Sequence, residues 1–324
     1  MQANALKRFA VAGITCGMAA CVAAQDYPTK PIRMIIPFPP GGGSDVTGRI
    51  VASALSERLA RQVVVDNRAG AGGVIGTEIA ANAASDGYTL LVVSLAHAIN
   101  PGLYDLKGRY DPIKSFAPVA IMAASPVVLV VHPGVPAKSV ADLLSLARKQ
   151  PGKLQYASAG VGSVTHLAAE LFKFAGKVDI LHVPFKGAGP AMLDVVAGHV
   201  NLFFGGLLAT VPQVRAGRLR ALGVGSLNRN PVLPDVPSIA EAGVPGYETV
   251  NWFGIVAPAG TAAAVVERLH KEISVVQRLP EIRKQFDADG ATVMQMSPAQ
   301  FGSYMVADLE KWGRVVKEAG IKAR

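Results

Sequence analysis

The sequence predicts an α/β fold with two lobes, in which mainly parallel sheets carry helices on both faces. The first observation is alternation: short apolar runs such as residues 32–36 and 154–157 are each followed by a glycine-rich loop and an amphipathic run. The second is a pair of long apolar segments, near 118–131 and 249–256, which predict strands that cross between lobes. The predicted organisation is a discontinuous lobe 1 (25–123 and 248–324) and a continuous lobe 2 (124–247).

Residues 37–45 join the first predicted strand to a predicted helix over 46–59. Three consecutive glycines in this stretch allow the backbone to expose its N–H groups, and Ser44 or Asp45 is expected to cap the helix. A helix N-terminus with open amides carries a partial positive charge and attracts anions. The stretch therefore predicts a site for a small anionic ligand.

Similar small-residue loops recur along the chain, at 67–73, 158–163, 185–190 and 205–206. In open α/β sheets the ligand binds at the carboxyl ends of the strands, so loops of both lobes should line the cleft. The polar groups expected there are backbone amides and the hydroxyls of Ser44, Thr47, Ser158, Ser163 and Thr165, with Lys186 as a candidate to reach a carboxylate. Such groups hold a carboxylate without activating it, which favours a binding protein over an enzyme.

The remaining helices are predicted from periodicity and capping residues. A helix should begin near Val74, with Ile75, Ile79 and Ala83 on one face. Capping boxes are expected for two others: Ser139 with Asp142 before a helix to Lys149, and Ser297 with Gln300 before a helix over 298–319. Further helices are predicted at 262–278 and 281–289, and a turn-rich link at 100–112.

The first 24 residues have the pattern of a secretory signal peptide. Lys7 and Arg8 precede an apolar run, and small residues allow cleavage before Gln25, which predicts export to the periplasm. Cys16 and Cys21 both lie in this segment, so the mature chain should have no disulfide and no cysteine nucleophile. Cleavage and lipidation at Cys21 is the alternative that the pattern leaves open.

The charge of the mature chain suits an anionic ligand. Cleavage removes Lys7 and Arg8 and no acidic residue, so the formal net charge falls from +9 to +7. The basic residues are scattered and only two Trp occur, a pattern that argues against a nucleic-acid surface. No later segment is apolar enough to suggest a membrane span.

Most catalytic and cofactor motifs fail on spacing. No phosphate-binding G-x-x-x-x-G-K-[ST] is present, and Ile75 stands where a dinucleotide fingerprint needs its third glycine. No G-x-S-x-G or H-E-x-x-H occurs, so neither a cofactor nor a metal is predicted. His166, three residues after Ser163, leaves open a secreted serine hydrolase that uses Ser163 or Ser44. Asp45 could serve as a base, but helix capping already explains it.

Four motifs carry a resemblance to a known family: residues 27–45, 64–73, 156–163 and 182–187. With shorter matches up to 257–261, they cover nearly the whole mature chain. The chain resembles the Bug proteins, the TctC-type extracytoplasmic solute receptors of tripartite tricarboxylate transporters. The resemblance implies a Venus flytrap of the periplasmic binding protein type II-like class, monomeric and without a cofactor. It also implies delivery of the ligand to integral-membrane permease subunits (TctA- and TctB-like). A receptor that presents its ligand to a sensor kinase is the alternative that the sequence leaves open.

The resemblance further implies a small organic carboxylate, held between the loops at 38–47 and 158–165 partly through ordered waters. Its implied binding residues are Phe38, Gly42, Gly43, Ser44, Thr47, Ser158, Gly160, Gly162, Ser163, Thr165 and Lys186. Candidates for the distal part of the pocket, which would select among carboxylates, are His97, Asn100, Phe185, Lys186 and Phe204.

Overall fold

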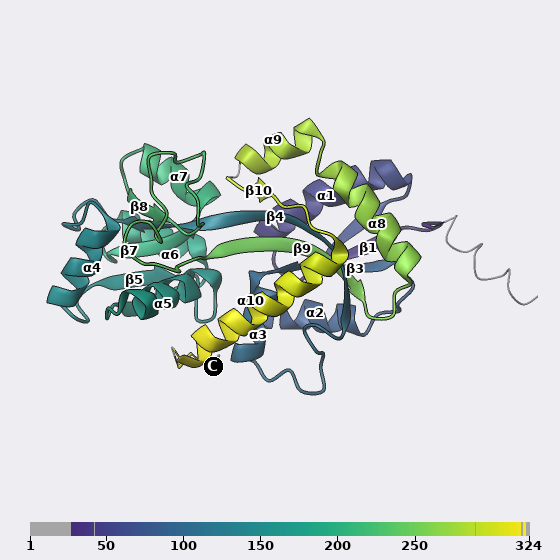
Figure 1. Ribbon diagram of the computed structural model, residues 1–324, viewed down its shortest axis with the longest axis horizontal. Helices are drawn as coiled ribbons and strands as arrows, with labels where there is room; N and C mark the ends of the chain where they lie inside the picture. Colours follow the sequence, from purple (N-terminus) through teal and green to yellow (C-terminus); the bar gives the residue numbers. More distant parts are fainter. Residues whose placement is uncertain (1–26, 42, 289, 319, 322–324) are drawn as a thin grey trace, which may run out of the picture.

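The computed structural model describes residues 27–41, 43–288, 290–318 and 320–321. They form two α/β lobes that two long strands connect, β4 (Phe116–Val131) and β9 (Val250–Pro258) (Figure 1). We call the lobe that contains the first strand lobe 1 and the other lobe 2. Across the described ranges, no helix is both long and apolar enough to cross a membrane. The predicted signal peptide, with Cys16 and Cys21, lies outside the described residues and stays a prediction.

Lobe 1 is a sheet with helices on both faces. Strand β1 pairs in parallel with β2 and β3, and β3 pairs antiparallel with β9. Because side chains alternate along a strand, Met34 packs on the face covered by α1 and α8, and Ile35 on the face covered by α2, α3 and α10. The elements are β1 (Ile32–Ile36), α1 (Gly43–Leu59), β2 (Val63–Asn67), η1 (Ala71–Gly73), α2 (Val74–Ala81), β3 (Thr89–Ser94), α3 (Leu95–Leu103), α8 (Ala263–Val276), α9 (Pro280–Ala288), β10 (Thr292–Val293) and α10 (Pro298–Glu318).

Lobe 2 repeats this layered plan. Strand β5 pairs in parallel with β6 and β7, and β7 and β8 lie on either side of β4. Helices α4 and α5 pack on one face through residues such as Leu143 and Leu167, and α6 and α7 on the other through Ala191 and Val211. The elements are α4 (Val140–Lys149), β5 (Gln155–Ser158), α5 (Val164–Gly176), β6 (Leu181–Pro184), α6 (Ala188–Val196), β7 (Leu202–Gly206), α7 (Leu207–Arg215) and β8 (Arg220–Val224).

The crossing strand β4 belongs to both sheets. Its first half pairs with β9 as far as Pro126 opposite Val250, and from Val127 onward it pairs with β7 and β8. The prediction that this segment is a strand crossing between the lobes is therefore confirmed. The pairings of β1 with β2 and β3, and of β5 with β6 and β7, are parallel, as predicted, whereas every pairing that involves β4 or β9 is antiparallel.

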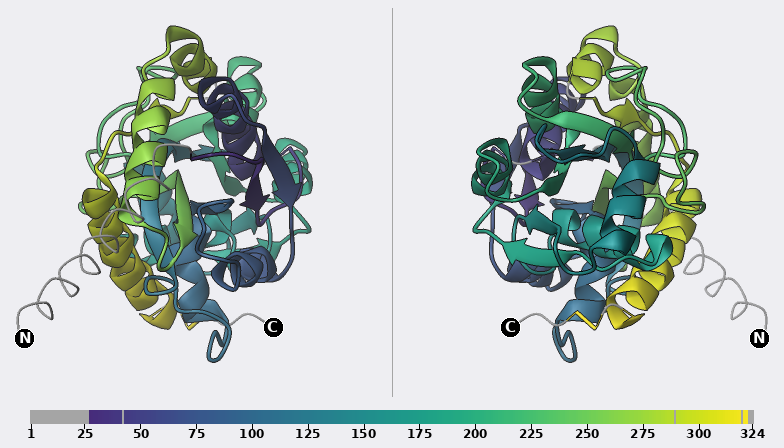
Figure 2. Two further views of the ribbon diagram at one scale, coloured as in Figure 1. Left: turned by 90° about the vertical axis from the view of Figure 1, so that its right-hand side faces the viewer. Right: turned by 90° about the vertical axis from the view of Figure 1, so that its left-hand side faces the viewer.

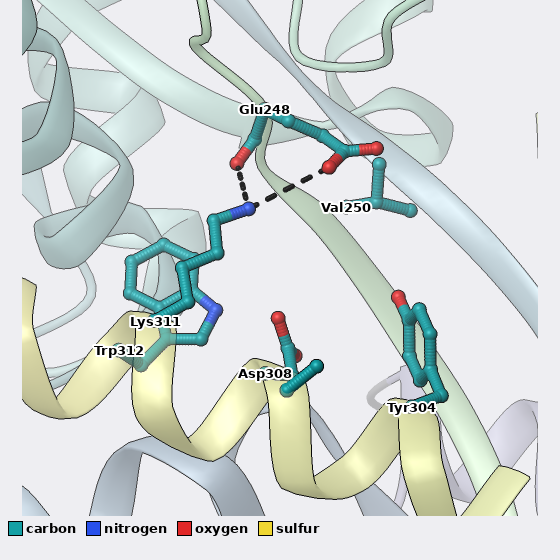
Figure 3. Close-up of a pocket in the computed structure, with 7 residues that line it drawn as sticks. Glu248, Val250, Tyr304, Asp308, Lys311 and Trp312 are labelled. Carbon is teal, nitrogen blue, oxygen red and sulfur yellow. Dashed lines mark hydrogen bonds and ion pairs between the residues drawn. The ribbon is translucent and has the colours of Figure 1, made fainter.

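Helix α10 is fastened to the start of β9, where the chain returns to lobe 1. The helix runs along one side of the molecule in both views of Figure 2, where it is yellow. Lys311 Nζ donates to the Glu248 carbonyl oxygen at 2.9 Å and lies 3.6 Å from its carboxylate (Figure 3). One turn away, Trp252 Nε1 donates to Asp308 Oδ2 at 2.6 Å, and burial raises the pKa of Asp308. These contacts join the C-terminal helix to a segment between the lobes.

Three local predictions were wrong, each for an identifiable reason. Helix α1 begins at Gly43, so Ser44 and Asp45 lie inside its first turn and neither is its N-cap. The expected turn-rich link begins within helix α3, which accommodates Pro101 near its C-terminal end. In α2 the buried residues include Val74, Thr77 and Ala80, whereas Ile75 is 43% exposed and its side chain lies against the positive-φ backbone of Gly70.

Candidate functional site

A cavity of about 680 Å³ lies between the lobes. Lobe 1 lines it with the loop at 38–41 and with Gly43 and Ser44, and lobe 2 with Ser163 and Val164. Helix α1 begins at Gly43 and α5 at Val164, so a helix N-terminus from each lobe reaches the same cavity. Amides in the first turn of a helix have no intrahelical acceptor, and the helix dipole adds partial positive charge there. The cavity therefore suits an anion.

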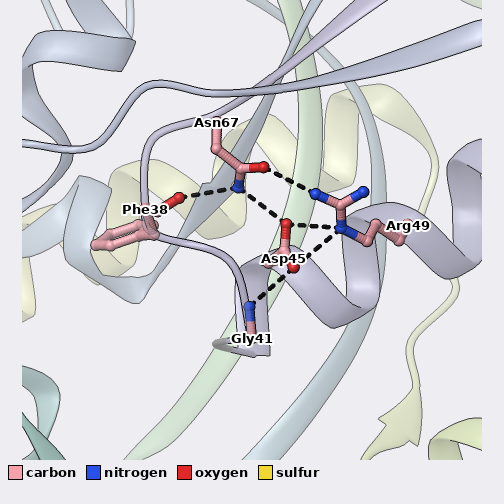
Figure 4. Close-up of polar contacts among 5 residues, drawn as sticks. All are labelled: Phe38, Gly41, Asp45, Arg49 and Asn67. Atoms are coloured by element: carbon pink, nitrogen blue, oxygen red, sulfur yellow. Dashed lines mark hydrogen bonds and ion pairs between the residues drawn. The ribbon is translucent and has the colours of Figure 1, made fainter.

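In lobe 1, Asp45 holds the glycine loop in shape (Figure 4). Its carboxylate accepts hydrogen bonds from the Gly41 N–H at 2.9 Å, from Arg49 Nε at 3.0 Å and from Asn67 Nδ2 at 2.9 Å. Asn67 Nδ2 also donates to the Phe38 carbonyl oxygen at 3.0 Å. Burial alone would raise the pKa of Asp45, but these hydrogen bonds hold it below its usual value. Asp45 is thus an ionised structural group that holds the loop from inside the first turn of α1, although it is not the predicted N-cap.

In lobe 2, neutral side chains hold the corresponding loop. Ser163 is the N-cap of α5: its Oγ accepts from the His166 N–H at 3.3 Å and donates to the Gly160 carbonyl oxygen at 2.7 Å. Thr165 Oγ1 accepts from the Ala159 N–H at 2.8 Å, and His166 Nδ1 accepts from the Gly162 N–H at 3.0 Å. These loop amides are therefore not open, contrary to the prediction. Of the first-turn amides of α5, those of Val164 and Thr165 remain as donors beside the cavities.

Behind this loop, three rings stack. The His182 ring lies 4.1 Å from that of His166 and 4.8 Å from that of Tyr156, and His182 Nε2 is 2.6 Å from Ser158 Oγ. Burial first, and then the nearby charges of His182 and Lys173, lower the pKa of His166 to about 3. His166 is consequently neutral, and burial lowers the pKa of His182 as well.

The serine hydrolase prediction requires a nucleophile–base pair, and the contacts at Ser163 do not supply one. Ser163 Oγ donates to a backbone carbonyl, and His166 Nδ1 accepts from a backbone amide. Their one hydrogen bond joins the hydroxyl to the His166 backbone rather than to its ring. The ring orientation needed for general-base activation of Ser163 is absent from the described structure.

The predicted site residues fall into three groups. Phe38, Gly43, Ser44, Gly162 and Ser163 line the large cavity, as does the distal candidate Asn100. Thr47 and Thr165 line an adjoining cavity.

The third group lies elsewhere. Ser158 and Phe204 are fully buried, Gly160 contributes its carbonyl to the loop, and Phe185 is half-buried against the lobe 2 core. Lys186 is exposed and is absent from the described lining of either cavity. His97 is buried, with Nε2 2.7 Å from the Pro112 carbonyl oxygen. Gly42 lies outside the described residues.

Sequence reasoning missed several lining residues. Ser94, Ala96 and Tyr104 line the large cavity from within or beside α3, a helix that was not predicted. Asn251 lines both cavities from β9. An amide inside an otherwise apolar crossing strand was the available signal for Asn251, whereas nothing local marked the residues near α3. Over the described ranges, no group of three His, Cys, Asp or Glu residues could hold a metal ion.

Two α/β lobes, joined by crossing strands and enclosing a cavity that faces a helix N-terminus from each, define a two-lobed solute-binding receptor. Residues 47–321 match the model of the tripartite tricarboxylate transporter family receptor, TctC, so the chain belongs to this family. The protein BugT of Bordetella pertussis is 37% identical over 325 residues, which cover 99% of this chain and 100% of BugT.

Solved structures agree with this assignment. Rpa4515 of R. palustris, solved with adipate, is 37% identical with a TM-score of 0.81, and the match covers 92% of this chain and 100% of that one. MatC from Rhodopseudomonas palustris, solved with bound malate, is 32% identical with a TM-score of 0.78 over 90% of this chain and 100% of MatC. The predicted two-lobed periplasmic binding protein fold and the predicted family are confirmed.

Proposed function

We propose that this protein binds a small organic carboxylate in its interlobe cleft in the periplasm and delivers it to the permease of a tripartite tricarboxylate transporter. The observation that carries the proposal is the convergence of the N-termini of α1 and α5 on one cavity from opposite lobes. The adipate of Rpa4515 and the malate of MatC are carboxylates, which supports this ligand class.

The expected mode of binding needs no cationic side chain. None of the described residues around the large cavity is Lys or Arg, so helix dipoles, first-turn amides and the Ser44 hydroxyl would hold the anion, while Ser163 supports the start of α5 as its N-cap. A hydrogen bond to a charged group contributes about 1.5–3 kcal/mol, so three or four could sustain roughly micromolar affinity.

Closure of the lobes would complete the site. The two crossing strands β4 and β9 are the described connections at which the lobes could bend. Contacts that the ligand makes only in the closed form would drive the closure. A closed, ligand-loaded receptor is then the form that the permease would recognise.

Titration calorimetry of the mature chain tests the proposal. A panel of carboxylates should include ligands that bind at one site, and the corresponding uncharged carboxamides should bind at least about tenfold more weakly because they lack the anionic group. Binding of sugars or cations alongside failure of every carboxylate would refute the ligand class. Delivery is tested separately, by ligand uptake in cells with the permease present and with it deleted.

A further inference from the structure

A second cavity, of about 350 Å³, adjoins the first. The two share as lining residues Gly41, Gly43, Val164, Ala188 and Asn251. Since Gly43 and Val164 are the first residues of α1 and α5, the second cavity opens at the helix N-termini proposed to hold the carboxylate. We call this second cavity the inner chamber.

The walls of the inner chamber are mostly apolar. Phe253 of β9, Phe286 of α9 and Leu207 of α7 line it, and all three side chains are buried. Val46 and Val127 complete the apolar surface. A ligand group that enters this chamber leaves water for hydrocarbon contacts, which favours an apolar group.

The polar groups of the chamber are few and uncharged. They are the side chains of Thr47, Ser125, Thr165 and Asn251, and the described residues around it include no Lys, Arg or His. Asn251 and Phe253, two residues apart, lie on the same face of β9, and Ser125 is the register partner of Asn251 on β4. Gly206 and Leu207, at the N-terminus of α7, also line the chamber, so a carboxylate inside it would lose its hydration and meet one further helix N-terminus but no cationic side chain.

We infer that the ligand is an amphipathic monocarboxylate, whose carboxylate lies at the N-termini of α1 and α5 and whose apolar body fills the inner chamber. This inference rests on the carboxylate site proposed above and adds the class of ligand. Phe253 and Phe286 select for the apolar body, and the mostly apolar walls select against a second carboxylate, which would meet only the N-terminus of α7 there, whereas the first carboxylate lies at two helix N-termini.

Calorimetry with hexanoate and adipate tests the inference, because the two have the same chain length and differ by one carboxylate. We expect hexanoate to bind the mature chain at least about tenfold more tightly than adipate. Affinity should rise by up to about fourfold per methylene from butanoate to hexanoate, and the heat-capacity change of binding should become more negative.

Two outcomes separate this inference from the proposed function. If adipate binds as tightly as hexanoate or more tightly, the ligand class inferred here is wrong while a carboxylate receptor remains. If neither acid nor any other carboxylate binds, the proposed function fails and the inference fails with it.

A charge-placement variant sharpens the test. Ala209 is exposed at the edge of the inner chamber, on α7, so Ala209→Lys adds a cation there without disturbing the core. It should raise the affinity for adipate relative to hexanoate by about three- to fivefold. Ala216→Lys, at the exposed C-terminal end of the same helix and away from both cavities, is the matched control and should leave the ratio unchanged. An unchanged ratio in Ala209→Lys would contradict the proposed position of the ligand body.

Discussion

Each lobe presents to the cleft a glycine-containing loop that is followed by a helix, but the two lobes stabilise this loop by different chemistry. In lobe 1 an ionised carboxylate, Asp45, gathers the Gly41 amide, Arg49 and Asn67 around the loop. In lobe 2 the neutral side chains of Ser163, Thr165 and His166 satisfy the loop amides. The feature that the two lobes share at this cavity is therefore the helix N-terminus, whereas the groups that support it differ.

The difference has consequences for pH and for mutation. In lobe 1, removal of the one central charge should cost most of the stability that the loop gains from its contacts. In lobe 2, several hydrogen bonds share that role, so removal of any one side chain should cost less stability. A neutral support that contains imidazoles is instead sensitive to mild acid, because His166 must stay uncharged.

The largest effect is expected from Asp45→Ala. The change leaves the Gly41 N–H and the Asn67 amide without their buried acceptor, so the free energy of unfolding should fall by about 2–3 kcal/mol. Urea unfolding at pH 7 measures it. Arg49→Met, which removes only the half-exposed partner, is the control and should lose clearly less. Equal losses in the two variants would mean that the ion pair, and not the bonds to the loop, holds lobe 1.

The second prediction concerns pH and lobe 2. The folded pKa of His166 is about 3, below the value near 6.5 expected in the unfolded chain, so between these values only the unfolded state binds the proton. Stability should therefore fall as the pH drops from about 6.5 toward 3, by up to about 1.4 kcal/mol per pH unit from this residue. The lowered pKa of His182 acts in the same direction, whereas Asp45 contributes to acid sensitivity only at lower pH.

Urea unfolding at pH 7, 6 and 5 compares the wild-type chain with His166→Gln. The variant should lose less stability per pH unit, because it removes one group that must stay neutral. A pH dependence identical to that of the wild type would show that His166 is not the titrating group. The carboxylate of Glu170 and the ammonium of Lys173 also face this cluster, and both are retained in the variant.

The third prediction compares the two helix N-termini directly. Ser163→Ala removes the N-cap of α5 and should cost about 1 kcal/mol of stability together with carboxylate affinity. Ser139→Ala removes the N-cap of α4, far from the cleft, and should cost similar stability with no loss of affinity. Ser44→Ala should weaken binding with less effect on stability, since Ser44 lies inside the first turn of α1. Unchanged affinity in both Ser163→Ala and Ser44→Ala would refute the proposed place of the anion.

The smallest effect is expected from Lys186→Ala. The side chain is exposed and outside the described lining of both cavities, so carboxylate affinity should change by less than about twofold. Titration calorimetry of the wild-type chain and the variant, with a carboxylate that binds the wild type, measures this change in affinity. A larger loss would restore Lys186 as a ligand-binding residue and would imply that the loop at 185–190 moves onto the ligand when the lobes close.

Local sequence patterns were sufficient wherever the structure is determined by neighbours in the chain. The capping box at Ser297 and Gln300 forms as predicted, with both reciprocal hydrogen bonds, and α10 begins at Pro298. The strand, glycine loop and helix order around residues 32–59 is also present, as is the second loop before α5. These features depend on hydrogen bonds across three or four residues and on side-chain periodicity, both of which are visible in the sequence.

Features that depend on residues far apart in the sequence were harder to predict from the sequence. Whether Ser158 faces the ligand or His182 is decided by the pairing of β5 with β6, and its hydroxyl is used by the imidazole. Which residues of α2 are buried depends on the core against which the helix packs, and Ile75 lies against the loop at Gly70 instead. A pattern of apolar residues specifies that a face is buried, but tertiary packing specifies what it is buried against.

By itself, then, the sequence determined the two-lobed α/β class, the family and the presence of a glycine loop before each of two helices. Only the tertiary structure placed the starts of α1 and α5 at one cavity and brought Asn251, Phe253 and Phe286 to its inner side. The physical reason is range. Strands, turns and caps are set by interactions within a few residues, whereas a cavity between lobes is assembled by the register of β4 with β9, which joins residues more than a hundred positions apart.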